Sequence, residues 1–231
     1  MSAIESERTF RKRRRFVVNL AAAGALGAGG LSGFLGRALA KGDLPAVPGV
    51  NQLKGTATVN GLPAVVGTPV TAHDRVATGP GSMAVVVLKD DAFLIRENTI
   101  LEFGESRGVL SHLLVQTGRV LSVFGRKPVV IKASNATIGI RGTGAYLEVE
   151  PGRVYFCLCY GEADIDGPGM AATRKVKTTH HEEPLILSDR GGVMAAESGP
   201  FLNHSDDELI LLESLVGREP PFMGVYPAKK Y

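Results

Sequence analysis

The sequence contains only two cysteines among its 231 residues, and it has no tryptophan. Two cysteines cannot build the set of disulfides that stabilises many small secreted domains, so we expect the fold to rest on its hydrophobic core. No Cys-x-x-Cys-His segment occurs, which excludes covalent haem attachment of the c type. A phosphate-binding glycine loop and an internal repeat of fixed period are absent as well. Neither a nucleotide-binding enzyme nor a repeat protein is therefore indicated.

Basic residues are scarce outside residues 1–40, which we call the leader. The leader holds seven Lys+Arg and two Asp+Glu out of totals of 26 and 23, which leaves 19 basic and 21 acidic side chains in the remainder. The net positive charge of the whole chain therefore comes from the leader. Because proteins that bind nucleic acid need a basic patch or stripe to hold phosphates, we expect no nucleic-acid partner.

The leader combines a charged start, a long apolar stretch and a small-residue end. Arg13 and Arg14 precede Phe16, and Ala38 and Ala40 form a small-x-small cleavage signal. This pattern resembles a twin-arginine (Tat) signal peptide, which directs folded proteins through the Tat translocase of bacteria. We therefore expect the leader to be removed and the protein to work in the periplasm. The stretch is also long enough to span a bilayer, so the alternative is an uncleaved inner-membrane anchor that faces the remainder toward the periplasm.

Short β-rich segments separated by turn residues fill residues 53–165, and no long helix interrupts them. A turn every eight to twelve residues or so is typical of an all-β sandwich, barrel or short solenoid. Asn-Gly at 60–61 predicts a type I′ hairpin, because both residues tolerate the positive φ angles of that turn. The runs 85–88 and 154–160 are apolar throughout, which predicts strands covered on both faces. A strand break is expected at 118–119.

Several of these segments resemble the FecR periplasmic domain, and the resemblance spans residues 51–165. Its most specific part is 136–143, Ala-Thr-Ile-Gly-Ile-Arg-Gly-Thr, which includes Arg141, Gly142 and Thr143. Within this motif we expect Gly142 to permit a β-bulge and Arg141 to pair with a carboxylate at the edge of the sheet. Other segments similar to the family are 76–79, 83–88 and 113–120.

The resemblance implies a compact all-β periplasmic module, built as a distorted sandwich or a short β-solenoid. The best-known members of the family relay transport signals to a sigma factor. By the same resemblance, those regulators carry a helical anti-sigma segment before a membrane helix and a second signalling domain after the module. We recognise neither in this sequence, so sigma-factor regulation does not carry over. The expectation is a module that binds an envelope protein or a small ligand.

Residues 166–231 are expected to form a C-terminal extension with a helix near 205–216. Ser205 and Glu208 make a capping-box pattern, and the leucines that follow repeat at helical spacing as far as Gly217. The apolar stripe of this helix is expected to pack on the β domain. Docking of a partner on the stripe is the alternative.

Cys157 and Cys159 are the leading candidates for chemistry, because residues two apart on a strand project from the same face. Both thiolates could bind a soft transition metal such as copper, zinc or iron, with His180, His181 and His204 as further ligands. If 180 and 181 lie on a strand they point to opposite faces, so only one of these two histidines is expected to join easily. The alternatives are a pair of buried apolar thiols or a strained disulfide.

Residues 104–108 match the Gly-x-Ser-x-Gly nucleophile elbow of serine hydrolases, with Ser106 in the nucleophile position. That motif needs a strand before the serine and a helix after it, and residues 109–115 make no convincing helix. We therefore expect a hairpin loop at Ser106 and no catalytic residues. The favoured interpretation is a non-enzymatic recognition module, a soft-metal protein is the alternative, and a serine hydrolase is the remote one.

Overall fold

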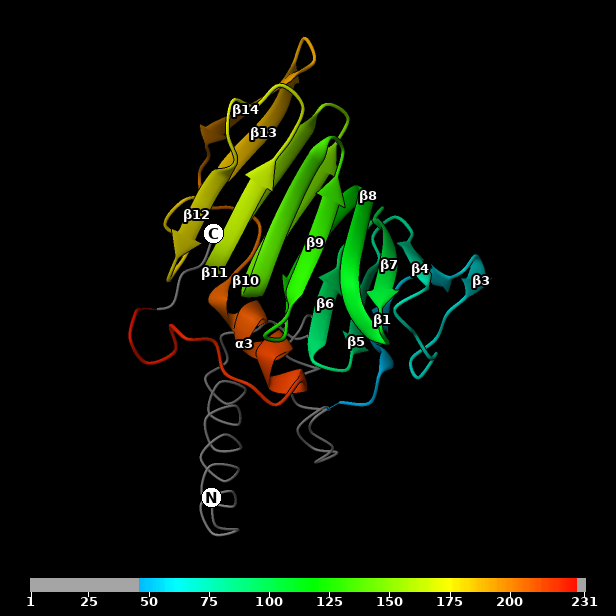
Figure 1. Ribbon diagram of the computed structural model, residues 1–231. Coiled ribbons are helices and arrows are strands. Elements are labelled where there is room, and N and C mark those ends of the chain that lie inside the picture. The colour runs from blue at the N-terminus through cyan, green and yellow to red at the C-terminus, as the bar shows by residue number, and fades with distance from the viewer. Residues whose placement is uncertain (1–45, 228–231) are drawn as a thin grey trace. The chain divides into compact units, whose positions relative to one another are not determined.

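The computed structural model describes residues 46–227 and places fourteen strands and one helix, α3 (Asp206–Leu215), in them (Figure 1). The first strands are β1 (Gly49–Lys54), β2 (Ala57–Val59), β3 (Leu62–Pro63), β4 (Arg75–Thr78), β5 (Met83–Leu88), β6 (Asp91–Ile95) and β7 (Ile100–Ser106). The later ones are β8 (Val109–Val123), β9 (Pro128–Ala133), β10 (Ala136–Glu150), β11 (Arg153–Asp166), β12 (Arg174–Thr178), β13 (Leu185–Arg190) and β14 (Val193–Ser198). The prediction of an all-β fold with a short C-terminal helix is confirmed.

All fourteen strands form one open sheet, because the long strands β8, β10 and β11 change partners midway. The first half of β8 pairs with β7, and its second half pairs with β6 and β10. Likewise β10 passes from β9 to β8, and β11 passes from β13 to β12. The two halves of the sheet share one hydrophobic core, in which the rings of Phe93 (β6) and Phe103 (β7) lie 5.0 Å apart.

The predicted break at 118–119 is wrong, because β8 runs through it without interruption. Gly118 has a φ of +94°, and a Cβ at this position would lie 2.4 Å from the Cα of Thr99. The glycine therefore lets the strand bend against a neighbouring backbone rather than end. This bend is the point at which β8 leaves β7 and joins β6 and β10.

Gly142 likewise lies where β10 changes its partner strand. Its φ is +59°, and the register between β10 and β11 shifts between Arg141 and Gly144, so the predicted bulge is present. The expected ion pair of Arg141 is not formed with any residue in 46–227, although Glu162 lies opposite it in the register. Glu162 instead pairs with Lys177 at 2.8 Å. The motif 136–143 thus contains the bulge at which β10 leaves β9 and joins β8.

The central strands bury both of their faces, as the apolar runs 85–88 and 154–160 predicted. Alternate residues of β5, β6, β8, β10 and β11 point into the shared core, and the residues between them form a second apolar face. We use the term second face for this surface throughout. Its fully buried apolar members include Val85, Leu94, Leu121, Tyr146, Tyr155, Cys157 and Cys159.

Helix α3 packs on the second face and contacts β6 and β8 (Figure 1). It begins with the predicted capping box, in which the Glu208 backbone N–H donates to Ser205 and the Ser205 N–H donates to the Glu208 carboxylate. Its leucines are buried, so the expected packing on the β domain is confirmed. Within residues 46–227, no helix is long and apolar enough to cross a bilayer.

The residues proposed for export, Arg13, Arg14, Phe16, Ala38 and Ala40, lie outside the described range. The division into a β domain at 51–165 and an extension at 166–231 stays a prediction. Three strands of the same sheet, β12, β13 and β14, follow residue 165.

Candidate metal centre

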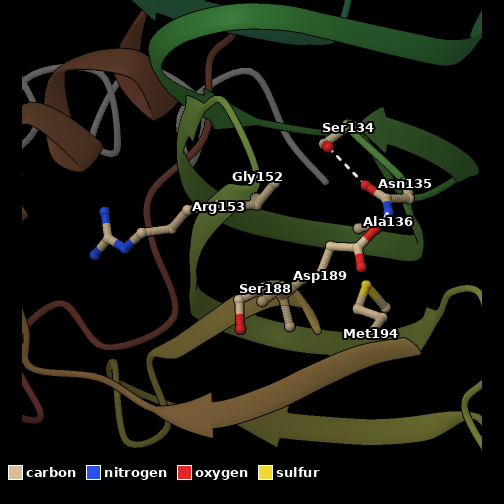
Figure 2. Close-up of a pocket in the computed structure, with 10 residues that line it drawn as sticks. Ser134, Asn135, Ala136, Gly152, Arg153, Ser188, Asp189 and Met194 are labelled. Carbon is tan, nitrogen blue, oxygen red and sulfur yellow. Dashed lines mark hydrogen bonds between the residues drawn. The ribbon is translucent and has the colours of Figure 1, made fainter. Parts of the chain in front are cut away.

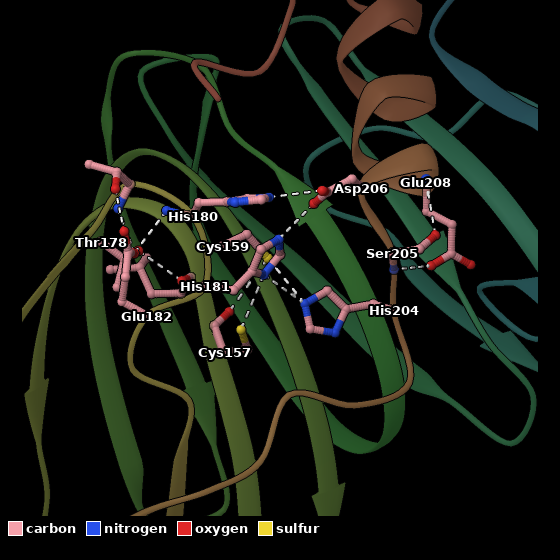
Figure 3. Close-up of polar contacts among 12 residues, drawn as sticks. Cys157, Cys159, Thr178, His180, His181, Glu182, His204, Ser205, Asp206 and Glu208 are labelled. Carbon is pink, nitrogen blue, oxygen red and sulfur yellow. Dashed lines mark hydrogen bonds and ion pairs between the residues drawn. The ribbon is translucent and has the colours of Figure 1, made fainter. Parts of the chain in front are cut away.

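Strand β11 supplies the first half of a buried polar cluster on the second face. Cys157 and Cys159 lie two residues apart, so both side chains leave the strand on the side away from the core. Both are fully buried free thiols, and the alternative of a disulfide between them is not realised. Figure 3 shows the two sulfur atoms facing the imidazoles that come from the later part of the chain.

His181 reaches the cysteines because β12 has already ended at Thr178. The Glu182 carboxylate accepts backbone N–H groups from Thr179 and His180, each at 2.8 Å, which closes a tight turn. His181 sits in this turn with a φ of +59°, a left-handed conformation that a strand would not allow. The turn directs the His181 ring toward Cys157, with 3.5 Å between Nδ1 and Sγ.

His204 completes the cluster from the segment just before α3. Its Nε2 lies 3.5 Å from the Sγ of Cys159, and its ring stacks on Tyr146 with centroids 4.5 Å apart. The capping box at Ser205 places this histidine, because the N-cap residue is its direct neighbour and starts the helix at a defined point. His204 is itself fully buried.

The ligand atoms of Cys157, Cys159, His181 and His204 all lie within 4.8 Å of one another. Tetrahedral Zn²⁺, with bonds of about 2.3 Å to sulfur and about 2.0 Å to nitrogen, separates a sulfur from a nitrogen by about 3.5 Å and two nitrogens by about 3.3 Å. Both sulfur–nitrogen contacts measure 3.5 Å, and the two nitrogens lie 3.2 Å apart. These three spacings fit one tetrahedral ion, and the remaining pairs of ligand atoms lie within 4.8 Å.

Hydrogen bonds at the outer edges of the rings determine which nitrogens face the centre. His181 Nε2 donates to Asp206 at 3.0 Å, and His204 Nδ1 donates to the carbonyl of Leu202 at 2.7 Å. In a neutral imidazole the other nitrogen is then an acceptor, so His181 Nδ1 and His204 Nε2 present lone pairs to each other. Both nitrogens can then accept a proton from the neighbouring thiols or bind a cation placed between them. A carboxylate or carbonyl behind each ligating histidine is the usual outer arrangement of a metal site.

Asp206 also binds the histidine that does not join the cluster. Its second carboxylate oxygen accepts from His180 Nε2 at 2.8 Å, so one side chain holds two neighbouring imidazoles (Figure 3). Only one of His180 and His181 lies beside the cysteines, although the two do not sit on a strand, because β12 ends at Thr178. His181 is the one that lies beside the cysteines, and His180 lies in the outer layer, where its ring packs against Phe222.

The electrostatics of the cluster favour a thiolate. Hydrogen bonding from Cys159, followed by bonds from His181 and His204, holds the pKa of Cys157 well below its usual value despite burial. Burial and the neighbouring Cys157 raise the pKa of Cys159. Burial alone would lower the pKa of His181, but hydrogen bonds with Asp206 and Cys157 outweigh it and raise that pKa. The pair of thiols therefore gives up one proton readily, which prepares one sulfur as a metal ligand.

The donor set selects among the metals. Two thiolates and two imidazoles in a tetrahedron suit Zn²⁺, and soft thiolates also suit Cu(I). All four ligands are buried, so no coordination position is open to a substrate or water. Closed four-ligand sites of this kind are structural rather than catalytic.

The remaining candidates for chemistry are weaker. Ser106 ends β7, and a turn at Arg107 and Gly108 leads directly into β8, so no helix follows the serine and the elbow geometry is absent. The hairpin expected there is confirmed. A small pocket between the β9–β10 turn and β13 is lined by polar groups that satisfy one another, since Ser134 donates to Asn135 and Asn135 donates to Asp189 (Figure 2).

Asp206 is the site residue that sequence reasoning missed. In the sequence it stands among three consecutive acidic residues just after the predicted cap Ser205, a pattern that indicates the first turn of a helix. That interpretation is correct for its place in α3. Its burial to 1% exposure and its bonds to two imidazoles depend on the docking of the helix, and a local pattern carries no signal for that.

Comparison with known proteins assigns no family. No family model matches the chain, and no curated protein matches it. Among solved structures, two crystal structures of a proposed anti-sigma factor from Parabacteroides distasonis ATCC 8503, at 1.65 and 2.50 Å resolution, are similar. They share 14% and 15% identity with this chain and cover 61% of it, over 74% and 73% of their own chains, with a TM-score of 0.45. This likeness is too distant to assign a function, and the resemblance to the FecR domain stays a prediction.

Proposed function

We propose that the chain is a metal-binding β module that holds Zn²⁺ at Cys157, Cys159, His181 and His204. One observation carries the proposal: two sulfurs and two imidazole nitrogens converge with the spacings of a tetrahedral zinc site. The metal would link strand β11 to the segment that leads into α3. Bonds of this kind stabilise a fold directly, because the free energy of metal binding becomes free energy of folding.

Elemental analysis of the purified protein tests this proposal. We expect one zinc per chain, and we expect its loss when Cys157→Ser and Cys159→Ser are combined. The adjacent histidines provide a matched pair of variants. His181→Gln removes a ligand and abolishes stoichiometric zinc, whereas His180→Gln removes only an outer contact and retains the metal at saturating concentration. Full zinc content in His181→Gln, or none in the unsubstituted protein refolded with zinc, would refute the assignment.

A second candidate function is recognition of an envelope partner on the exposed side of β9 to β12, which faces away from the core. The specific observation is a groove of about 450 Å³ across these strands, whose lining includes Gly139, Arg141, Asp164 and Lys175. Gly139 contributes no side chain, so the groove is open where its neighbours on the strand are filled. Arg141 is exposed and makes no ion pair with residues 46–227, which leaves its guanidinium available to a partner.

Filling the groove tests this second function. A Cβ at Gly139 would approach no atom closer than 3.8 Å, so Gly139→Leu preserves the strand and occupies the groove. Thr137→Leu is the matched control, because it adds a similar side chain two residues away on the same face, outside the groove. We expect Gly139→Leu alone to lose partners captured by cross-linking in isolated membranes. Equal capture by both variants would refute the groove as the recognition surface.

Export to the periplasm is part of the same proposal and has its own test. If the leader is a Tat signal, replacing Arg13 and Arg14 together by lysine blocks transport while the charge stays the same. We expect the unsubstituted protein in the periplasmic fraction, or in the inner membrane with a periplasmic domain, and the double variant in the cytoplasm. Periplasmic accumulation of the double variant would refute the Tat assignment.

A further inference from the structure

The metal centre connects two parts of the chain that pack on each other. Cys157 and Cys159 belong to the sheet through β11, whereas His204 belongs to the segment 199–227, which we call the C-terminal strap. The strap contains the linker after β14, helix α3 and the turns that follow it. A metal bound to His204 and to β11 would be a direct bond between strap and sheet.

The strap covers part of the second face. Leu94 and Leu121 on this face are fully buried, and they belong to β6 and β8, the two strands that α3 contacts. Tyr146 is covered in the same way by the ring of His204. Further along the strap, Phe222 packs edge-on against Tyr160 with ring centroids 5.9 Å apart. Removal of the strap would therefore expose apolar side chains of several strands at once.

Besides this apolar packing, the strap is attached by hydrogen bonds and ion pairs that water can replace. Arg96 donates to the carbonyl of Asn203 and to Glu208, each at 2.8 Å. Tyr160 donates to Glu213, and Tyr155 donates to the carbonyl of Pro200. When the strap leaves the sheet, each of these groups gains a hydrogen bond to water. A metal–histidine bond is different, since its loss also leaves the ion with an incomplete set of ligands.

We propose that metal occupancy of the centre controls whether the C-terminal strap stays docked, so that removal of the metal uncovers the second face. This inference rests on the proposed zinc site. Any opening that breaks the bond to His204 leaves three ligands for the metal. Where these three bind it far more weakly than the full set, metal at 100 times its dissociation constant suppresses such opening by about 100-fold. The centre is thus a metal-dependent latch between strap and sheet.

Hydrogen exchange of the full chain, followed by mass spectrometry of peptides, tests the latch. The protein is measured with Zn²⁺ at 100 times its dissociation constant and again after chelation. We expect exchange in α3 to accelerate about 100-fold after chelation, while peptides of β9 and β10 change less than threefold. A dye that binds exposed apolar surface should then fluoresce only in the chelated sample. Zinc bound at one per chain with unchanged exchange in α3 overturns the latch and leaves the zinc site standing.

Other outcomes are equally decisive. Equal acceleration in α3, β9 and β10 means that the whole fold opens, which also overturns the latch. Absence of stoichiometric zinc overturns both the site and the latch. Two variants separate the metal bond from ordinary docking. His204→Gln should exchange rapidly in α3 with or without zinc, whereas Glu213→Gln, which weakens docking away from the metal, should exchange faster and keep the difference between the two conditions. A full 100-fold difference in His204→Gln contradicts the proposal.

Discussion

The outer carboxylate Asp206 offers the sharpest test of the metal centre, because it touches no metal and yet positions a ligand. Each of its two oxygens accepts one imidazole N–H, from His180 at 2.8 Å and from His181 at 3.0 Å. Asp206→Asn keeps the shape but leaves one oxygen as an acceptor and turns the other position into an N–H donor. The variant therefore loses at least one of the two imidazole bonds, and it loses the negative charge behind the His181 ring.

The expected loss of metal affinity follows from the outer position of this residue. Substitution of such carboxylate partners costs about 10- to 100-fold in affinity, which corresponds to about 1.4 to 2.7 kcal/mol. All four ligands remain in Asp206→Asn, so the stoichiometry should stay at one metal per chain. His181 should also lose part of the stabilisation of its charged form, because the hydrogen bond with Asp206 is the largest of the contributions that raise its pKa.

A competition titration against a chromogenic zinc chelator measures this loss. Asp207→Asn is the matched control, since it removes the same charge from the same turn of α3 at a half-buried position outside the cluster. We expect Asp207→Asn to bind zinc within about threefold of the unsubstituted protein, because the helix dipole is affected equally in both variants. If both variants bind zinc equally well, Asp206 is only a helix-terminal charge and the tautomer argument is wrong.

Three further predictions concern the sheet and its covering. Lys127→Met leaves Asp91 buried without its 2.6 Å ion pair and should lower the free energy of unfolding by about 3 kcal/mol at pH 7. Because burial already raises the Asp91 pKa, the difference in unfolding free energy between the two proteins should shrink as the pH falls and the carboxylate is protonated. Gly142→Ala should cost about 1 to 2 kcal/mol in denaturant unfolding from its φ of +59° alone, because the nearest atom to the new Cβ lies 3.5 Å away. Burial is the first cause that raises the pKa of three tyrosines of the second face, so their phenol groups should ionise only as the protein unfolds above pH 10. These three are Tyr146, Tyr155 and Tyr160. The free energy of unfolding should therefore fall as the pH rises in that range. Ionisation of more than two of the five tyrosines before unfolding, measured by an absorbance titration, would contradict this.

Local patterns predicted the parts of the site that local forces determine. The apolar run 154–160 predicted a strand buried on both faces, and two residues of spacing then placed Cys157 and Cys159 on one side of it. The capping box at Ser205 predicted where α3 begins, and with it the position of the residue before the helix, His204. In both cases the backbone conformation follows from residues a few positions apart.

The remaining features depend on contacts between distant segments. The sequence analysis considered His180 and His181 on a strand, whereas the left-handed conformation of His181 depends on a turn closed by the Glu182 carboxylate. The hydrogen bonds of that turn outweigh burial and lower the pKa of Glu182 to about 2. Gly118 was expected to end a strand, but the backbone of Thr99 packs so closely there that only a glycine fits. Sequence-local reasoning assigns glycine to turns and has no information about such a neighbour.

The composition of the second face is itself an argument for a specific role of the cluster. Leucine and phenylalanine side chains would attach α3 to the sheet without any polar group to desolvate. The chain instead buries two thiols, three imidazoles and the Asp206 carboxylate in this layer. Burial of such groups costs free energy unless each finds a partner, and the two inner imidazole nitrogens have only the weak S–H donors of Cys157 and Cys159 within this layer. Stability of the helix contact alone therefore does not account for these residues, which supports the proposal that the contact depends on metal.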